Sequence, residues 1–390
     1  MILRKALLCS FTVLVGLTAC NTGQNTLKDA NGITHINMVS SHEISNGTQL
    51  AKVGKKVEYI PLEYTDECAV ADVYKLFPAK DFYLILTPDE LLRFGKDGKF
   101  LGKIGKKGNG PGEFVVIVDC VVDEEKELIY GLDMMKNRLL CYKFDGTYEK
   151  EVPISHFCLQ FCKLPGDKFA VSPVNFNGDR ESKLVVVNNQ GDTLQHFYNP
   201  VRYKRESMPV MIDDQNSYKE FGDQVRFHQI FNDTIFSLTP QMALNPMYIM
   251  DCGKFKMPLD VVASYEKWEK TGKNYYLVDN VQESEHQLFI RYKYNDKYHR
   301  CVYNKDNGDL AHLNQRDSLG IPNNLDNGLP FWPMVVRNNK EMMTLWPAFK
   351  LKAEVKRMKE KGVKISEELR KLDETMKISD NPVIQVVREI

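Results

Sequence analysis

The chain has 390 residues, of which 43% are hydrophobic and 11% aromatic, and its 52 Lys and Arg residues balance 52 Asp and Glu residues. This composition is sufficient for a substantial core, and the length is compatible with one large all-β domain. Because the chain has no surplus of positive charge, the composition argues against a protein that binds nucleic acid through counterion release.

The first twenty residues have the pattern of an export signal. Arg4 and Lys5 form a positive start, and an apolar run over 6–16 follows that is too short to span a bilayer as a permanent helix. The next residues, Leu17–Cys20, resemble the bacterial lipobox. We therefore predict a lipoprotein signal peptide over 1–19 and a lipid on Cys20. A plain secretory peptide is the alternative.

The residues after Cys20 are polar and contain glycine, so 20–50 is predicted to be a flexible tether that starts at the lipid. Removal of residues 1–19 takes away two cations and leaves a formal charge of 50 − 52 = −2. The expected location is the cell envelope, with the lipid in the outer membrane. Residues 21–26 have no acidic run of the kind associated with surface export, which slightly favours the periplasmic side.

Seven cysteines remain after processing, at positions 68, 120, 141, 158, 162, 252 and 301. Their odd number and scattered spacing show no disulfide framework, and most lie in apolar runs where cysteine behaves as a small hydrophobic residue. Cys158 and Cys162 lack the spacing and the neighbouring histidines of a metal site. We predict no metal and no cofactor.

The first strands alternate in hydrophobicity or consist of short apolar runs. They are expected over 56–63, 81–87, 91–95 and 100–104. Asp97 and Gly98 connect the last two, and this pair favours the positive φ of a tight hairpin.

A glycine-rich corner follows, and its members are Gly108, Gly110, Pro111, Gly112 and Glu113. Glycine allows the chain to turn sharply here before an apolar strand over 114–122. A phosphate-binding loop is the alternative, but such loops present backbone N–H groups and open a helix. Pro111 has no N–H and a strand follows, so we predict a structural corner in which Glu113 accepts hydrogen bonds from the backbone.

Groups of strands then recur along the chain. They are expected over 128–132, 138–144 and 148–154, and again over 168–171, 183–188 and 193–198. The turn glycines Gly98, Gly146 and Gly191 are 48 and 45 residues apart. A repeat of this length with several strands in each unit is typical of the blades of a β-propeller.

The repeat is looser towards the C-terminus, where Gly191 and Gly308 are 117 residues apart. Further strands are expected over 224–231, 234–238, 247–251, 274–281, 286–294, 298–304, 333–337 and 341–345, with a closing strand over 382–389. A short helical insertion is predicted over 259–271. The sequence therefore predicts an all-β fold, a six-bladed β-propeller over 51–390.

A second insertion, residues 350–377, carries ten Lys or Arg and six Asp or Glu. Its apolar residues lie at helical spacing on both sides of Gly362, and Ser366 is a candidate N-cap. We predict a helical hairpin packed on the outside of the propeller. A helix that binds a membrane surface or a partner is the alternative that its net charge of +4 allows.

Several stretches together resemble the six-bladed β-propeller lipoproteins of Bacteroidota, which are related to NHL-type propellers. The resemblance rests on residues 57–62, 94–98, 100–101, 105–114, 232–236, 246–254, 325–333 and 380–383. It extends over essentially the whole mature chain and implies a propeller located in the envelope. Gly95 departs from the pattern, in which an aspartate commonly precedes the turn. The resemblance supplies no catalytic motif.

No hydrolase, zinc-protease or nucleotide-binding motif is present in the sequence. Arg226 and His228 are alternate residues of one expected strand, so they share a face and could bind an anion in the central channel. A surface role or a satisfied structural role is the more common alternative for both. Asp119 lies on an expected inner strand and could face the same axis. Trp332 could supply an aromatic platform near one mouth, although core packing is the more common role.

Three functions are open at this point. The first is an exported, lipid-anchored, non-enzymatic binding or scaffold module for a glycan, peptide or partner protein. The second is a hydrolase or lyase with its site in the central channel, because propellers host such sites. The third is an assembly subunit that docks a partner through the hairpin at 350–377.

Overall fold

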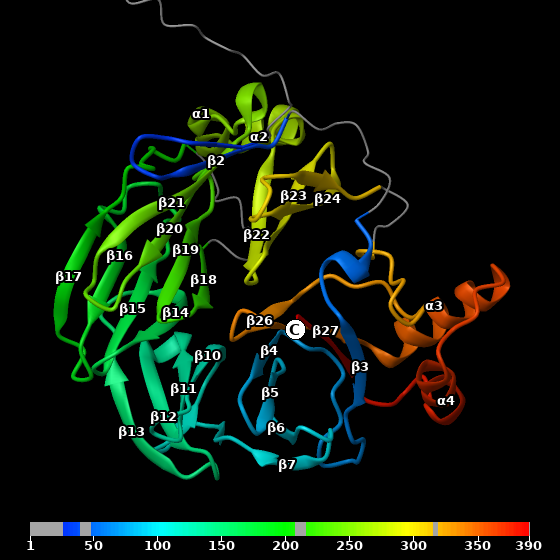
Figure 1. The fold of residues 1–390 in the computed structure, drawn as a ribbon. Helices are drawn as coiled ribbons and strands as arrows, with labels where there is room; N and C mark the ends of the chain where they lie inside the picture. The colour runs from blue at the N-terminus through cyan, green and yellow to red at the C-terminus, as the bar shows by residue number, and fades with distance from the viewer. Residues whose placement is uncertain (1–25, 40–47, 207–215, 315–318, 390) are drawn as a thin grey trace, which may run out of the picture.

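The structure, a computed structural model, describes residues 26–39, 48–206, 216–314 and 319–389. Six sheets follow one another in chain order around a ring (Figure 1). The innermost strand of each sheet contacts the innermost strand of the next. This arrangement confirms the predicted six-bladed β-propeller.

The first three blades each consist of four antiparallel strands. Blade 1 contains β4 (Lys75–Pro78), β5 (Phe82–Leu86), β6 (Leu91–Gly95) and β7 (Phe100–Lys103). Blade 2 contains β10 (Ile117–Asp123), β11 (Leu128–Asp133), β12 (Arg138–Lys143) and β13 (Tyr148–Pro153). Blade 3 contains β14 (Cys158–Leu164), β15 (Lys168–Pro173), β16 (Ser182–Val187) and β17 (Thr193–Tyr198).

The last three blades are less uniform. Blade 4 contains β18 (Asn216–Phe221), β19 (Gln224–Gln229), β20 (Thr234–Leu238) and β21 (Leu244–Asp251). Blade 5 contains β22 (Leu277–Glu283), β23 (Gln287–Tyr294), β24 (Lys297–Asn304) and β25 (Leu310–His312). Blade 6 contains β26 (Val335–Arg337), β27 (Glu341–Trp346), β28 (Val383–Arg388) and β3 (Lys56–Pro61).

The ring closes through both ends of the chain. Strand β3 pairs antiparallel with β28, from Val383 opposite Pro61 to Arg388 opposite Lys56. The prediction that residues 56–63 form a strand of the first blade is wrong, because this strand closes blade 6. The inner strand of blade 1 is instead β4, whose four residues end in a proline and are too short to show a periodic pattern.

The residues before β3 also differ from the tether predicted over 20–50, because part of this segment belongs to a sheet. Strand β1 (Thr26–Lys28) pairs with β2 (Thr34–Asn37), and β2 runs parallel to β21 at the edge of blade 4. Ile36 and Met38 have no exposed surface, and neither has Leu50 in the short helix η1 (Leu50–Lys52). Ile36 and Met38 share a cluster with Ile235, and Leu50 shares one with Phe289. All three are therefore held by residues about 200 or more positions away in sequence, which a local pattern does not reveal.

The glycine-rich corner connects blade 1 to blade 2 through a short parallel ladder of β8 (Lys106–Lys107) and β9 (Glu113–Phe114). The Gly110 N–H donates to Oε2 of Glu113 at 2.8 Å. Gly112 has φ +69°, and a Cβ there would lie 2.6 Å from the ring of Tyr148. The turn therefore requires glycine at this position.

Helices lie outside the ring, as α1 (Leu259–Ala263), α2 (Tyr265–Thr271), α3 (Ala348–Glu360) and α4 (Glu367–Thr375) (Figure 1). Single-turn helices are η2 (Met134–Lys136), η3 (Gly253–Phe255) and η4 (Gly272–Asn274). Ser264 separates α1 from α2, and its side chain accepts from the Lys267 N–H as the N-cap of α2. Ser366 caps α4 in the same way. The α3–α4 hairpin packs on blade 6, where Leu351 and Leu369 share a buried cluster with Trp346.

The apolar cores lie between successive blades, because both faces of each sheet are covered by its neighbours. The seven cysteines in the described part are buried, and none forms a disulfide. Over the same residues, no helix has the length and the apolar character needed to span a bilayer.

Candidate functional site

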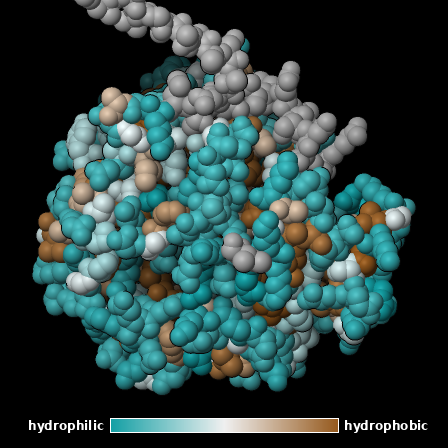
Figure 2. All heavy atoms as spheres, in the orientation of Figure 1, coloured by the Kyte–Doolittle hydropathy of each residue, from teal (hydrophilic) through white to brown (hydrophobic). Residues whose placement is uncertain are grey.

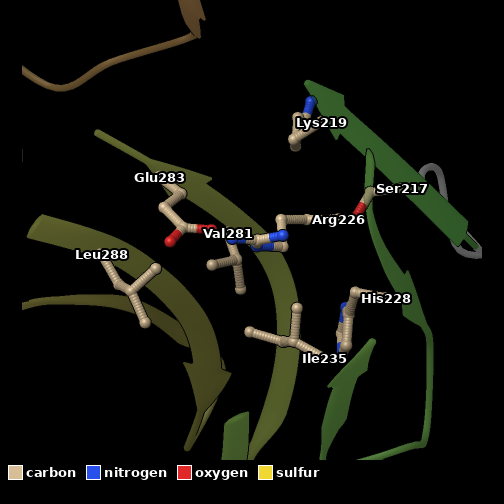
Figure 3. Close-up of a pocket in the computed structure, with 8 residues that line it drawn as sticks. All are labelled: Ser217, Lys219, Arg226, His228, Ile235, Val281, Glu283 and Leu288. Atoms are coloured by element: carbon tan, nitrogen blue, oxygen red, sulfur yellow. Dashed lines mark hydrogen bonds and ion pairs between the residues drawn. The ribbon is translucent and has the colours of Figure 1, made fainter. Parts of the chain in front are cut away.

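A narrow pocket lies between blades 4 and 5, beside the central channel (Figure 3). Its lining comes from β18 and β19, from β20, and from β22 and β23. The lining residues are Ser217, Lys219, Arg226, His228, Ile235, Val281, Glu283 and Leu288. The pocket holds about 260 Å³ of empty space, which includes its open mouth. The enclosed cavity itself is only about 10 Å³, which is room for about one water-sized group.

Arg226 and His228 share this pocket because β19 alternates its side chains between two faces. Val225 and Phe227 point the other way, into the core shared with blade 3. The two polar residues do not face the central channel, although the sequence-based hypothesis of an axial anion site requires it. They lie instead on the second strand of the blade, so they face blade 5 rather than the axis.

Arg226 is held by a network of buried polar groups. Its Nε donates to Oε2 of Glu283 at 2.7 Å, and its Nη1 donates to Ser237 Oγ at 2.8 Å. Glu283 also accepts from the Tyr248 hydroxyl at 2.8 Å and from Lys305 Nζ at 3.0 Å. The Arg226 and Glu283 side chains are 6% and 3% exposed, so the pair is screened from water.

Phe221, the last residue of β18, supports the same network. The guanidinium carbon of Arg226 lies 4.5 Å from the centre of the Phe221 ring, and Lys305 Nζ lies 4.3 Å from it. Two cations on one aromatic ring are each attracted by its negative face. The ring therefore fixes the position of both cations relative to Glu283.

His228 is neutral in this environment. Burial lowers its pKa to about 4, although the backbone carbonyl of Asn232 opposes the shift. Nε2 lies 2.9 Å from that carbonyl oxygen, which can only accept. The proton therefore sits on Nε2, and Nδ1 is the nitrogen that can accept a hydrogen bond.

Asp119 lies on the innermost strand of blade 2 and outside this pocket. It accepts from Lys75 Nζ at 3.0 Å and from the Phe161 N–H at 3.0 Å. Burial raises the pKa of Asp119, while Lys75 and, more weakly, Lys219 act to lower it. Lys219 lies between the pocket and Asp119. It lines the pocket, stands opposite Arg226 in the β18–β19 ladder, and interacts with Asp119.

One end of the channel is bridged by the turn between β26 and β27. Arg337 Nη2 donates to Glu124 of blade 2 at 2.9 Å. Oδ1 of Asn339 accepts from the Gly222 N–H at 3.3 Å, and its backbone carbonyl accepts from the Glu285 N–H at 2.8 Å. Blades 2, 4, 5 and 6 are therefore joined across this end.

Trp332 lies away from this pocket and is only 9% exposed. Its ring packs edge-on against Phe289, with centroids 5.7 Å apart, and the guanidinium of Arg300 lies 5.5 Å from it. The ring is therefore part of the packing between blades 5 and 6 and carries a cation on its surface.

Lys219 and Glu283 were not singled out from the sequence. A signal for Glu283 was available, because Arg226 lies within the apolar run of residues 225–227 and a buried arginine requires a carboxylate. The sequence could not indicate which carboxylate serves, since 57 residues separate the pair.

No cluster of three or more His, Cys, Asp or Glu side chains that could hold a metal ion occurs within the described ranges. The pocket is lined by two cations, one carboxylate and a neutral imidazole. Such a lining, with apolar walls from Ile235, Val281 and Leu288, can hold a small anionic group.

The ring and its pocket define a six-bladed β-propeller with a polar site between two blades. The chain belongs to the DUF4934 family, described as a domain of unknown function, whose model matches residues 33–388. No curated protein matches the chain.

Three solved structures are similar to the chain. A Bacteroides fragilis protein named as exported is 19% identical, with a TM-score of 0.70 over 86% of this chain and 95% of its own. A DUF4221 family member from Bacteroides vulgatus is 9% identical, with a TM-score of 0.47 over 66% and 84%. Virginiamycin B lyase from Staphylococcus aureus is 11% identical, with a TM-score of 0.39 over 66% and 73%. Of these three, the first alone bears on the fold.

Proposed function

We propose that this chain is an exported binding protein of the cell envelope, anchored by a lipid on Cys20, which takes a carboxylate-bearing glycan or peptide into the pocket between blades 4 and 5. The similar Bacteroides fragilis protein is named as exported, which supports the location. The signal peptide and Cys20 lie outside the described residues, so the anchor rests on the lipobox pattern.

The observation that carries the proposal is the cationic lining of the pocket. Arg226 is fixed by Glu283 and Ser237, and Lys219 stands opposite it on the neighbouring strand. A carboxylate in the pocket would meet both cations. Hydrogen bonds between charged partners are the strong ones in a site shielded from water.

Binding fits these groups better than proton transfer does. Glu283 already accepts hydrogen bonds from three donors. His228 keeps its Nε2 proton on the backbone carbonyl of Asn232. Both groups that could act as an acid or a base are engaged in holding the walls of the pocket.

The proposal is tested by titrating the processed chain, residues 20–390, with D-galacturonate and with neutral D-galactose, using isothermal calorimetry. The expected result is that galacturonate binds and galactose does not, and that Lys219→Gln weakens binding about tenfold. Lys256→Gln is the matched control, since Lys256 is exposed, lies outside the pocket and pairs with Asp233 of blade 4 at 2.6 Å. Equal binding of the two sugars would show that the pocket does not recognise a carboxylate.

A further inference from the structure

The described chain begins at the outer edge of blade 4, close in sequence to the predicted lipid on Cys20. Thr26, the first residue of β1, stands opposite Ile36 of β2, and Ile36 stands opposite Met250 of β21. Neighbouring strands are about 4.8 Å apart, so two spacings place Thr26 about 10 Å from Met250. The start of the described chain and the end of β21 are therefore neighbours in space.

Covalent geometry limits the distance between this edge and the lipid. Six peptide units connect Cys20 to Thr26. An extended chain spans at most about 3.5 Å per residue, so Cys20 lies within about 20 Å of Thr26 in any conformation. A domain of this size has a diameter on the order of 50 Å. A lipid on Cys20 therefore holds the edge of blade 4 near the membrane and places no such limit on the other blades.

The segment after β21 covers this edge. It comprises η3, α1, α2 and η4, residues 253–274, and is called the rim segment below. The Met38 N–H, just after β2, donates to the Asp251 carbonyl at 2.9 Å, and Met38 shares a buried cluster with Cys252. In Figure 1, α1, α2 and β2 lie at the top of the ring, whereas α3 and α4 lie at its right. The rim segment and the start of the described chain thus occupy one side of the ring.

The rim segment exposes groups that suit a lipid–water interface. Leu259, the first residue of α1, is 36% exposed, and Tyr265, the first residue of α2, is 48% exposed. Residues 253–274 contain five Lys and three Asp or Glu, a formal charge of 5 − 3 = +2. Tyrosine is enriched at membrane interfaces, and lysine keeps its ammonium among the headgroups while its stem lies on apolar groups. Positive charge is also attracted to anionic lipids.

The surface of the molecule does not suggest deep insertion. Figure 2 shows the face turned to the viewer as mainly hydrophilic, with apolar residues in small scattered groups. A surface of this kind binds a membrane weakly by itself, and stable attachment takes a second signal. The lipid supplies that signal, and the rim segment decides which side of the propeller meets the membrane.

We propose that the rim segment lies against the phospholipid surface that holds the lipid of Cys20. Leu259 and Tyr265 contact the headgroup region, and the lysines of the segment face the phosphates of anionic lipids. The propeller then stands on its edge, with the top of the ring in Figure 1 towards the membrane, so both ends of the central channel stay open to the aqueous phase. The inference rests on the anchor in the proposed function and adds the orientation of the propeller.

The test is quenching of tryptophan fluorescence by brominated lipids. The full chain, with its signal peptide, is produced in a bacterium that processes lipoproteins and is reconstituted in vesicles of phosphatidylethanolamine and phosphatidylglycerol. Leu259→Trp places a tryptophan in the rim segment, and Phe349→Trp, at a position of α3 that is 57% exposed, is the matched control. Relative to the parent, brominated acyl chains should reduce the added fluorescence of Leu259→Trp and leave that of Phe349→Trp unchanged.

A second pair of variants tests the charge of the rim segment. Lys270→Glu with Lys273→Glu should reduce the quenching of Leu259→Trp, because phosphatidylglycerol repels the new carboxylates. Lys361→Glu with Lys364→Glu, at exposed positions between α3 and α4, changes the formal charge equally and should leave the quenching unchanged.

Mass spectrometry of the N-terminal peptide separates the two ways in which the idea can fail. A Cys20 without lipid refutes the anchor in the proposed function and this orientation together. A lipidated Cys20 with no quenching at position 259, or with equal or stronger quenching at position 349, refutes the orientation alone. The orientation is also refuted if Lys270→Glu with Lys273→Glu leaves the quenching at position 259 as strong as before.

Discussion

The buried pair of Arg226 and Glu283 gives the most direct test of how the site is built. In Arg226→Met the side chain keeps most of its length, but Glu283 loses a donor at 2.7 Å and a full positive charge. Removal of one partner of a buried ion pair costs about 3–5 kcal/mol, since the other charge stays buried. Glu283 retains Lys305 and Tyr248, which places the expected loss near the lower end, about 3 kcal/mol.

The loss is measured by urea unfolding of the processed chain, followed by tryptophan fluorescence and by circular dichroism. Lys270→Met is the control, because Lys270 pairs with Glu266 at 2.6 Å on the exposed face of α2 and should contribute less than about 1 kcal/mol. In a Glu283→Gln background, Arg226→Met should cost about 1–2 kcal/mol less than in the parent. A loss in Arg226→Met no larger than in the control would refute the argument that this pair is screened from water.

Three further predictions concern stability. The pKa of His228 is about 4 in the folded chain and about 6.5 in the unfolded chain, so its stabilising contribution is present above pH 6.5 and is lost as the pH falls towards 4. Between pH 7.5 and 5, the free energy of unfolding of the parent should therefore fall by about 2 kcal/mol more than that of His228→Gln, measured by urea unfolding. Gly112→Ala should lower the free energy of unfolding by about 2–4 kcal/mol, because the new Cβ meets the ring of Tyr148. Gly32 also has positive φ but no close neighbour, so Gly32→Ala should lower it by only about 1 kcal/mol. Equal losses would show that the ring of Tyr148 moves aside. Leu351→Ala should lower the free energy of unfolding by about 2–5 kcal/mol, because Leu351 is fully buried. Phe349 is 57% exposed, so Phe349→Ala should lower it by less than about 0.5 kcal/mol. A small loss at Leu351 would mean that the α3–α4 hairpin is not part of the folded core.

Much of the fold was accessible from local patterns. Turn glycines about 45–48 residues apart, each between short apolar strands, indicate blades because a strand group of this kind buries its faces only against another copy of itself. The hairpin at 350–377 was also legible, since its apolar residues and its N-cap at Ser366 lie at helical spacing.

The partners of the terminal strands were not accessible in this way. The pairing of β3 with β28 joins residues more than 320 positions apart, and β2 joins β21 across more than 200. A strand pattern shows that a segment needs a neighbour, but any edge strand of suitable register can supply one. The same limit explains why residues 26–39 looked like a tether.

The sequence by itself determined that the chain builds a ring of blades, that it begins with an export pattern, and that Arg226 and His228 share one face of a strand. Only the tertiary structure decided that this face meets blade 5, that Glu283 neutralises Arg226, and that β1 and β2 lie beside the end of β21. The physical reason is that periodicity depends on neighbours along the chain, whereas a charge or a ring acts on whatever lies within a few ångströms of it in space.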